Sequence, residues 1–219
     1  MTLLPCVEVE PRVPVTASVV WLHGLGASGD DFPPIVPHLR LPHVRFVFPH
    51  APARPVTING GYVMPSWYDI RNLDFHARDR EDIAQIRASA VAIEALLARE
   101  VARGVPPERT VLAGFSQGGA LALYVAHRHA SRLAGAMVLS AYLLAPDALA
   151  EGSPANADTP LLFQHGRHDD VVPDFAGRAA YDAFARPGRD VLRKTYTMGH
   201  EVCPQQIADI GAWLRARIG

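Results

Sequence analysis

A serine set among glycines is the first residue of this chain whose context indicates chemistry. Residues 114–118 read Gly-Phe-Ser-Gln-Gly, a G-x-S-x-G pattern, with an apolar run at 110–113 before it and a helix-compatible run at 120–127 after it. A strand, a sharp turn and a helix present such a serine as a nucleophile, and the glycines allow the tight crossing. The alternative is a glycine-rich turn whose serine, Ser116, is incidental.

A nucleophilic serine needs a base, and the base needs an acid to orient it. His200 follows the run 191–196, which alternates like a late strand, and is therefore the preferred base among ten histidines. Asp169 and Asp170 follow the apolar run 160–166, and both qualify as the acid. Catalytic groups gather at the carboxyl ends of parallel strands. The order Ser, Asp, His along the chain is the order found in α/β-hydrolases.

The loop after the first apolar strand is rich in glycine and predicts a site for a negatively charged oxygen. Residues 23–29 read His-Gly-Leu-Gly-Ala-Ser-Gly and follow the run 18–22. In hydrolases of this kind, one backbone N–H in such a loop and one after the nucleophile stabilise the oxyanion. We expect Leu25 and Gln117 to supply them. Without Ser116, an ordinary glycine-rich loop would be the better interpretation.

The remaining elements predict an α/β fold in one domain over residues 1–219. Strands alternate with helices, which favours a mostly parallel central sheet with helices on both faces. Strands are expected at 18–22, 44–48, 110–113, 134–139, 160–166 and 191–196, and helices at 78–103, 120–129, 175–184 and 204–218. The long connection at about 51–76 holds an Asn59-Gly60 hairpin turn and is expected to form a flap or lid.

Together these motifs resemble the phospholipase/carboxylesterase family of α/β-hydrolases, which includes bacterial carboxylesterases and acyl-protein thioesterases. The resemblance runs from about Val19 to Trp213. It is carried by residues 23–26 (His-Gly-Leu-Gly), 64–70 (Met-Pro-Ser-Trp-Tyr-Asp-Ile), 114–119 (Gly-Phe-Ser-Gln-Gly-Gly), 165–166 (His-Gly) with Asp169 and 172–173 (Val-Pro), and 199–200 (Gly-His).

The resemblance implies a Ser116–Asp169–His200 triad and the Leu25 and Gln117 amides as oxyanion donors. It selects Asp169 over Asp170, and it implies a small acyl pocket with no large cap domain. Residues that we expect to contact the substrate are Leu25, Met64, Trp67 and Val172, although Trp67 could equally belong to a hydrophobic cluster under the flap. One departure is the stretch 140–144, Ser-Ala-Tyr-Leu-Leu, where the family has Ser-Gly-aromatic-Leu-Pro.

Composition sets the expectations for partners and location. The formal net charge of −1 gives no reason to expect a nucleic-acid partner or an anionic membrane surface. No apolar run reaches the length of a membrane span, and the first residues lack the basic start of a signal peptide. With only two cysteines, Cys6 and Cys203, a cytoplasmic protein is expected. No metal or organic cofactor is expected, whereas a homodimer through apolar flap residues stays open.

The sequence therefore predicts a serine carboxylesterase that hydrolyses esters of short to medium acyl chains through an acyl-enzyme. The first alternative is the same chemistry on another bond, in an acyl-protein thioesterase or a lysophospholipase. A non-catalytic binding module or a dimeric scaffold with the hydrolase fold would be a more distant alternative.

Overall fold

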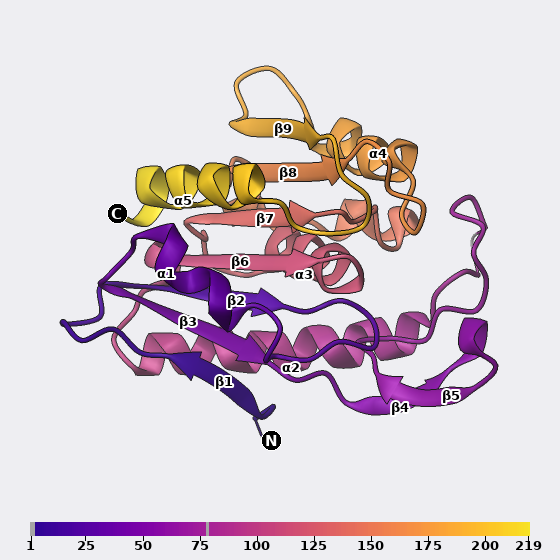
Figure 1. Ribbon diagram of the computed structural model, residues 1–219, viewed down its shortest axis with the longest axis horizontal. Coiled ribbons are helices and arrows are strands. Elements are labelled where there is room, and N and C mark those ends of the chain that lie inside the picture. Colours follow the sequence, from indigo (N-terminus) through magenta and orange to yellow (C-terminus); the bar gives the residue numbers. More distant parts are fainter. Residues whose placement is uncertain (1–2, 78) are drawn as a thin grey trace.

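The computed structural model describes residues 3–77 and 79–219. In this part of the chain, seven strands form one sheet in the order β1-β3-β2-β6-β7-β8-β9 (Figure 1). All neighbours are parallel except β1 and β3. The strands are β1 (Cys6–Val9), β2 (Ala17–Leu22), β3 (Val44–Pro49), β6 (Thr110–Phe115), β7 (Gly135–Leu139), β8 (Leu161–Gly166) and β9 (Val191–Tyr196).

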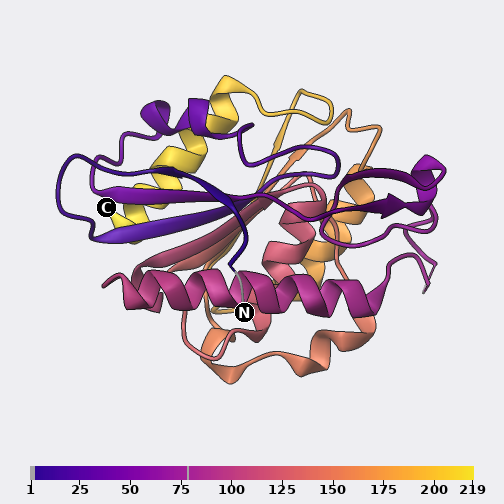
Figure 2. The ribbon, with the colours of Figure 1, turned by 90° about the horizontal axis from the view of Figure 1, so that it is seen from below.

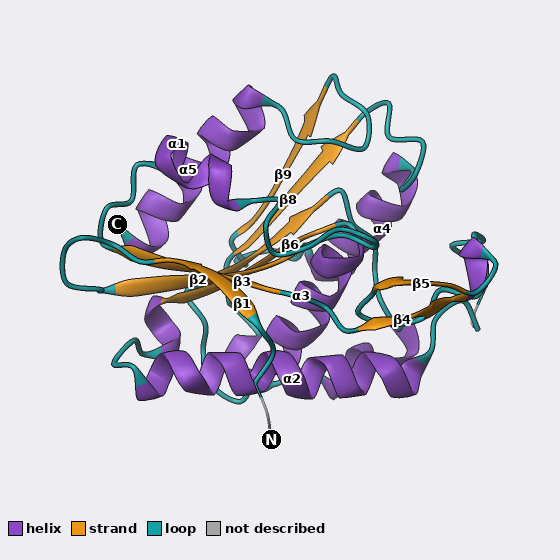
Figure 3. Cartoon of the chain, turned by 60° about the horizontal axis from the view of Figure 1, so that its bottom comes forward, coloured by secondary structure: helices purple, strands orange, loops and turns teal. Residues whose placement is uncertain are grey.

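Helices cover both faces of this sheet. Figures 2 and 3 show α1 and α5 on one side of the strands and α2 and α3 on the other. The helices are α1 (Val36–Leu39), α2 (Ile83–Ala102), α3 (Gln117–Arg128), α4 (Asp174–Phe184) and α5 (Pro204–Ile218). Short 3-10 helices lie at Pro33–Ile35, Thr57–Asn59, Pro107–Arg109, Pro146–Glu151 and Pro154–Asn156. The predicted α/β architecture is thus confirmed.

Two hydrophobic layers hold the helices against the sheet. The first packs α2, α3 and α4 on one face and includes Ile93, Leu121 and Phe163. The second packs α1 and α5 on the other and includes Phe46 and Trp213. Strands β2, β3, β6, β7 and β8 are buried along nearly their whole length. A strand that is buried on both faces appears in the sequence as an unbroken apolar run, so the positions of these five strands could be predicted from the sequence.

Helix α2 begins later than its periodicity predicts. Of the predicted start, Arg78 lies outside the described residues, and residues 79–82 are not helical. Instead, Ile70 and Glu81 form an antiparallel bridge. The Asp82 side chain then accepts a hydrogen bond from the N–H of Gln85 at 3.0 Å and caps the helix. Tertiary pairing with the segment around residue 70 therefore sets this helix boundary.

A two-stranded hairpin, β4 (Ala53–Val56) and β5 (Tyr62–Pro65), lies beyond the carboxyl ends of β2 and β6 (Figure 1). Val56 pairs with Tyr62 across the predicted turn, in which Gly60 has a φ of +65°. Apart from this hairpin, the described connections at that end of the sheet contain irregular chain and short 3-10 helices. No large cap domain is evident among the described residues.

Candidate active site

Ser116 occupies a strained turn between β6 and α3. Its φ of 54° and ψ of −122° lie where few non-glycine residues are found. The strand and helix cross closely there: a Cβ at Gly118 would lie 2.4 Å from the carbonyl oxygen of His23, and one at Gly114 would lie 2.3 Å from that of Gly118. The Ser116 N–H donates to the carbonyl of Leu139 at 2.8 Å. Strain held by such surroundings is typical of functional residues.

Asp169 and His200 are paired on adjacent loops after β8 and β9. The distance between Asp169 Oδ2 and His200 Nδ1 is 2.8 Å. Asp169 Oδ1 accepts from the N–H groups of Val171 (3.0 Å) and Val172 (2.8 Å), which fixes the carboxylate. Since an ionised carboxylate only accepts, Nδ1 carries the proton and Nε2 is left as a base. The other candidate acid, Asp170, is exposed, so the geometry also favours Asp169.

A cavity of about 390 Å³ lies at the carboxyl edge of the sheet. Ser116 and His200 both line it, and the ring of Phe115 packs on that of His200 with centroids 4.7 Å apart. Most of the remaining lining is apolar and comes from loops: Leu25, Ile58, Ile70, Leu73, Val171 and Val172. The arrangement presents a serine hydroxyl and an unprotonated imidazole nitrogen to an apolar space.

Two backbone N–H groups at this cavity are free to bind an oxyanion. Among the described residues, the N–H groups of Leu25 and Gln117 donate to no protein acceptor, although both residues line the cavity. Gly26, with a φ of +74°, turns the loop, and its own N–H donates to the carbonyl of Pro65 at 2.9 Å. N–H groups without a protein acceptor at an apolar cavity are suited to a ligand oxygen. Gln117 also begins α3, whose dipole favours negative charge.

His23, at the start of the Leu25 loop, has a structural role. Its Nδ1 donates to the carbonyl of Gly24 at 2.7 Å, and its Nε2 accepts from the N–H of Ala51 at 3.0 Å. Burial lowers the pKa of this imidazole, which keeps it neutral. With both ring nitrogens occupied, His23 holds the loop in place and has no free nitrogen to act as a base.

Two of the four predicted substrate-binding residues lie away from the cavity. Leu25 and Val172 line it, but Met64 and Trp67 do not. Trp67 is fully buried, and its Nε1 donates to the carbonyl of His23 at 2.8 Å, so it belongs to the core. Met64 is half-buried, with its sulfur accepting from Asn59 Nδ2 at 3.3 Å. An aromatic residue on a loop suggests a ligand surface, but the loop folds inward at Trp67.

The sequence also missed buried polar groups that hold the site. The Gln117 side chain accepts from the N–H of Trp67 at 2.9 Å and donates to the carbonyl of Tyr68 at 2.7 Å. Arg80 and Tyr142 line the cavity as well. No local pattern could identify these residues, because their roles arise from contacts between distant segments.

No three His, Cys, Asp or Glu side chains lie close enough together to hold a metal ion within residues 3–77 and 79–219. In the same residues, no helix combines the length and the apolar character that crossing a membrane requires.

The fold and the site define the class as an α/β-hydrolase of the serine type. The model of the Phospholipase/Carboxylesterase family matches residues 5–218. Acyl-protein thioesterase 1 of Gibberella zeae is 36% identical over 214 residues, which cover 93% of this chain and 91% of that protein.

Solved structures agree with this match. The crystal structure of acyl-protein thioesterase 2 from Zea mays has a TM-score of 0.85 at 32% identity and covers 98% of this chain and 99% of that one. That of esterase PE8 has a TM-score of 0.84 at 28% identity, with 99% and 100% covered. The chain therefore belongs to the phospholipase/carboxylesterase family, as its motifs predicted, and is an esterase or thioesterase.

Proposed function

We propose that this protein is a serine carboxylesterase that hydrolyses esters of short to medium acyl chains through an acyl-enzyme. The observation that carries the proposal is the 2.8 Å contact between Asp169 and His200, at a cavity that Ser116 also lines. The apolar lining supports an acyl substrate. The moderate cavity volume of about 390 Å³ supports a chain of limited length.

The mechanism follows from what each group can donate or accept. Ser116 Oγ attacks the ester carbonyl carbon while His200 Nε2 takes its proton. Asp169 holds the ring in this tautomer and stabilises the imidazolium. The Leu25 and Gln117 N–H groups stabilise the oxyanion, each by about 2.7–4 kcal/mol in the transition state. His200 then protonates the leaving alcohol, and the acyl group stays on Ser116.

Water completes the cycle by the same steps. His200 takes a proton from water, the hydroxide attacks the acyl carbon, and the second tetrahedral intermediate uses the same two N–H groups. Collapse of that intermediate releases the carboxylic acid and returns the proton to Ser116. The chain's own residues supply every proton transfer in this scheme.

The test is hydrolysis of p-nitrophenyl esters with acyl chains of about two to twelve carbons, since single methylenes alter kcat/KM measurably. We expect kcat/KM to peak at short or medium chains and to fall at least about 10³-fold in Ser116→Ala. A fluorophosphonate should label wild-type Ser116 stoichiometrically. Wild-type turnover in Ser116→Ala, or no labelling, would refute the proposal.

A second candidate is an acyl-protein thioesterase, favoured by the identity to proteins of that name. The triad chemistry is the same for oxygen and sulfur leaving groups, so the substrate decides. Side-by-side kcat/KM values on oxygen and thio esters of one acyl chain separate the two candidates. A consistent preference for the thioester would favour the second.

For partners and location, we propose a small ester or acyl substrate and a cytoplasmic protein. The free thiols of Cys6 and Cys203 support a reducing compartment. Exposed apolar residues on the hairpin, Tyr62 and Val63, support a homodimer as a further state. Sedimentation of the purified protein and of a Tyr62→Ser/Val63→Ser variant tests the dimer.

A further inference from the structure

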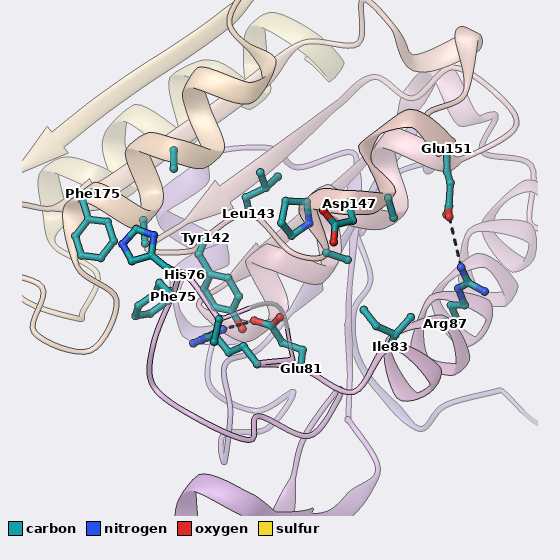
Figure 4. Close-up of a pocket in the computed structure, with 17 residues that line it drawn as sticks. Phe75, His76, Glu81, Ile83, Arg87, Tyr142, Leu143, Asp147, Glu151 and Phe175 are labelled. Atoms are coloured by element: carbon teal, nitrogen blue, oxygen red, sulfur yellow. Dashed lines mark hydrogen bonds and ion pairs between the residues drawn. The ribbon is translucent and has the colours of Figure 1, made fainter.

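A second cavity, of about 470 Å³, lies next to the catalytic one and contains none of the triad. Side chains from the loop before α2, from the segment after β7 and from α4 surround it (Figure 4). Phe75, Leu143, Ala148, Phe175 and Ala179 are among its apolar lining residues. The mechanism proposed above makes no use of this space.

Arg80 and Tyr142 line both cavities. The guanidinium carbon of Arg80 lies 4.1 Å from the ring centroid of Phe75 and 4.3 Å from that of Tyr142. Its Nη1 pairs with the carboxylate of Glu81. Phe75, Tyr142 and Glu81 lie together at one end of the cavity in Figure 4.

The surrounding chain holds Arg80 firmly. Its carbonyl accepts from the N–H of Arg71 at 2.7 Å, and the next residue, Glu81, bridges to Ile70. The Arg80 side chain is 5% exposed and that of Glu81 is 9% exposed. Removing either member of such a buried pair is costly, which makes Arg80 a stable part of the wall.

We propose that Arg80 is the partition between the two cavities and sets the upper limit of the acyl chain that the enzyme accepts. This inference rests on the proposed esterase function. A longer acyl chain on Ser116 that extends past Tyr142 would contact the guanidinium of Arg80, which is stacked and ion-paired. Displacing it would break the contacts with Phe75, Tyr142 and Glu81 and bury an apolar chain against a charge. Without the Arg80 side chain, the two cavities would connect, and the space open to an acyl chain on Ser116 would more than double.

The experiment compares long and short substrates in Arg80→Ala and wild type. We expect the ratio of kcat/KM on the dodecanoyl ester to that on the butanoyl ester to rise about tenfold or more, since even one newly buried methylene has an effect of that size. Arg80→Met is the matched control. It also leaves Glu81 unpaired and removes the charge but keeps most of the side-chain volume, so the ratio should rise clearly less than in Arg80→Ala.

Filling the second cavity provides an independent arm. Ala179 lines that cavity from α4 and is exposed. Ala179→Phe should leave the wild-type ratio unchanged, because the acyl chain does not reach the cavity. In the Arg80→Ala background the same substitution should restore the preference for short chains. If Arg80→Ala fails to fold, the double variant Arg80→Ala/Glu81→Gln takes its place in every comparison, because it also removes the unpaired buried charge of Glu81.

The partition is overturned if a folded variant without the Arg80 side chain keeps the wild-type ratio, or if Arg80→Met shifts the ratio as strongly as Arg80→Ala. Labelling rates of Ser116 with short-chain and long-chain alkyl fluorophosphonates should follow the same ratio. Labelling of Ser116 does not require turnover. A wild-type protein that is labelled but hydrolyses neither esters nor thioesters would therefore refute the proposed function, while the labelling rates would still test the partition.

Discussion

The Gln117 side chain gives the sharpest test of how the site is held. Its backbone N–H is one of the two proposed oxyanion donors, and its side chain is buried. There it accepts from the N–H of Trp67 and donates to the carbonyl of Tyr68. Gln117→Ala removes these two hydrogen bonds and the contact of Nε2 with the hydroxyl of Ser66 at 3.1 Å, and it keeps the backbone N–H. The substitution therefore separates the support of the site from its chemistry.

The size of the effect follows from the groups left behind. The Trp67 N–H loses its partner in a fully buried position, which costs about 1–3 kcal/mol. The Tyr68 carbonyl keeps the hydroxyl of Ser66 at 2.7 Å, so losing its second donor costs only about 0.5–1.5 kcal/mol. We expect the free energy of unfolding in urea to fall by about 2–4 kcal/mol.

Activity should fall as well, because the same segment positions the oxyanion loop. Trp67 Nε1 holds the carbonyl of His23, and the Pro65 carbonyl holds the N–H of Gly26, on either side of Leu25. A displaced Leu25 N–H would lower kcat by up to about 10²–10³-fold, the effect of losing one oxyanion donor. A folded Gln117→Ala whose stability changes by less than about 1 kcal/mol and whose kcat is unchanged would refute this reasoning.

Gln117→Glu is the matched control. Its carboxylate still accepts from Trp67 but cannot donate to Tyr68, and burial opposes its charge. The protonated form restores the donor. Gln117→Glu should therefore be closer to wild-type stability at about pH 5 than at about pH 8, while Gln117→Ala should show no such recovery.

Three further predictions concern the triad, the elbow and two histidines, His23 and His127. Asp169→Asn should lower kcat about 10⁴-fold, because an amide facing His200 favours the wrong tautomer. Labelling of Ser116 at high pH should change little. A kcat within tenfold of the wild-type value would contradict this prediction. Gly118→Ala should reduce the yield of folded protein or its Tm sharply, because its Cβ would meet the backbone of residues 22 and 23; an unchanged Tm would show that the crossing relaxes. Burial lowers the pKa of His23 and His127, so their stabilising contribution is full above about pH 6.5 and is lost as pH falls below it, by up to about 1.4 kcal/mol per pH unit for each histidine. His127→Gln should therefore flatten the fall of unfolding free energy measured in urea between about pH 6.5 and 5, and an equal slope in both proteins would contradict the assignment.

The parts of the fold that the sequence predicted are those with a local cause. Five central strands read as apolar runs because both faces are covered, and α5 begins at the proline that the pattern indicates. The edge strand β1 escaped detection because its burial is only partial and Glu8 interrupts it. Its stabilising partners are distant: Glu8 contacts Arg99 of α2 and Arg103 just after that helix, each at 2.8 Å.

The candidate site divides in the same way. Ser116 carries a local signature, and His200 and Asp169 follow strand ends that the sequence marks. Trp67 has the right residue type for a substrate wall, but its position depends on how the loop packs against His23. Arg80 has the wrong type for an apolar pocket, and only its stacking on Phe75 and Tyr142 makes it part of the wall.

The two halves of the site are built differently, and this difference bears on specificity. The catalytic half is cross-linked by buried hydrogen bonds among the elbow, the Leu25 loop and the base of the hairpin, so a change there disturbs several groups at once. The half that we propose to bind the acyl chain is formed by loop side chains such as Leu73 and Val171, which are 71% and 57% exposed. Substitutions there cost little stability and reshape the space beside Ser116. Since the proposed chemistry is the same for oxygen esters and thioesters, we expect substitutions in the second half to change substrate preference more than substitutions in the first.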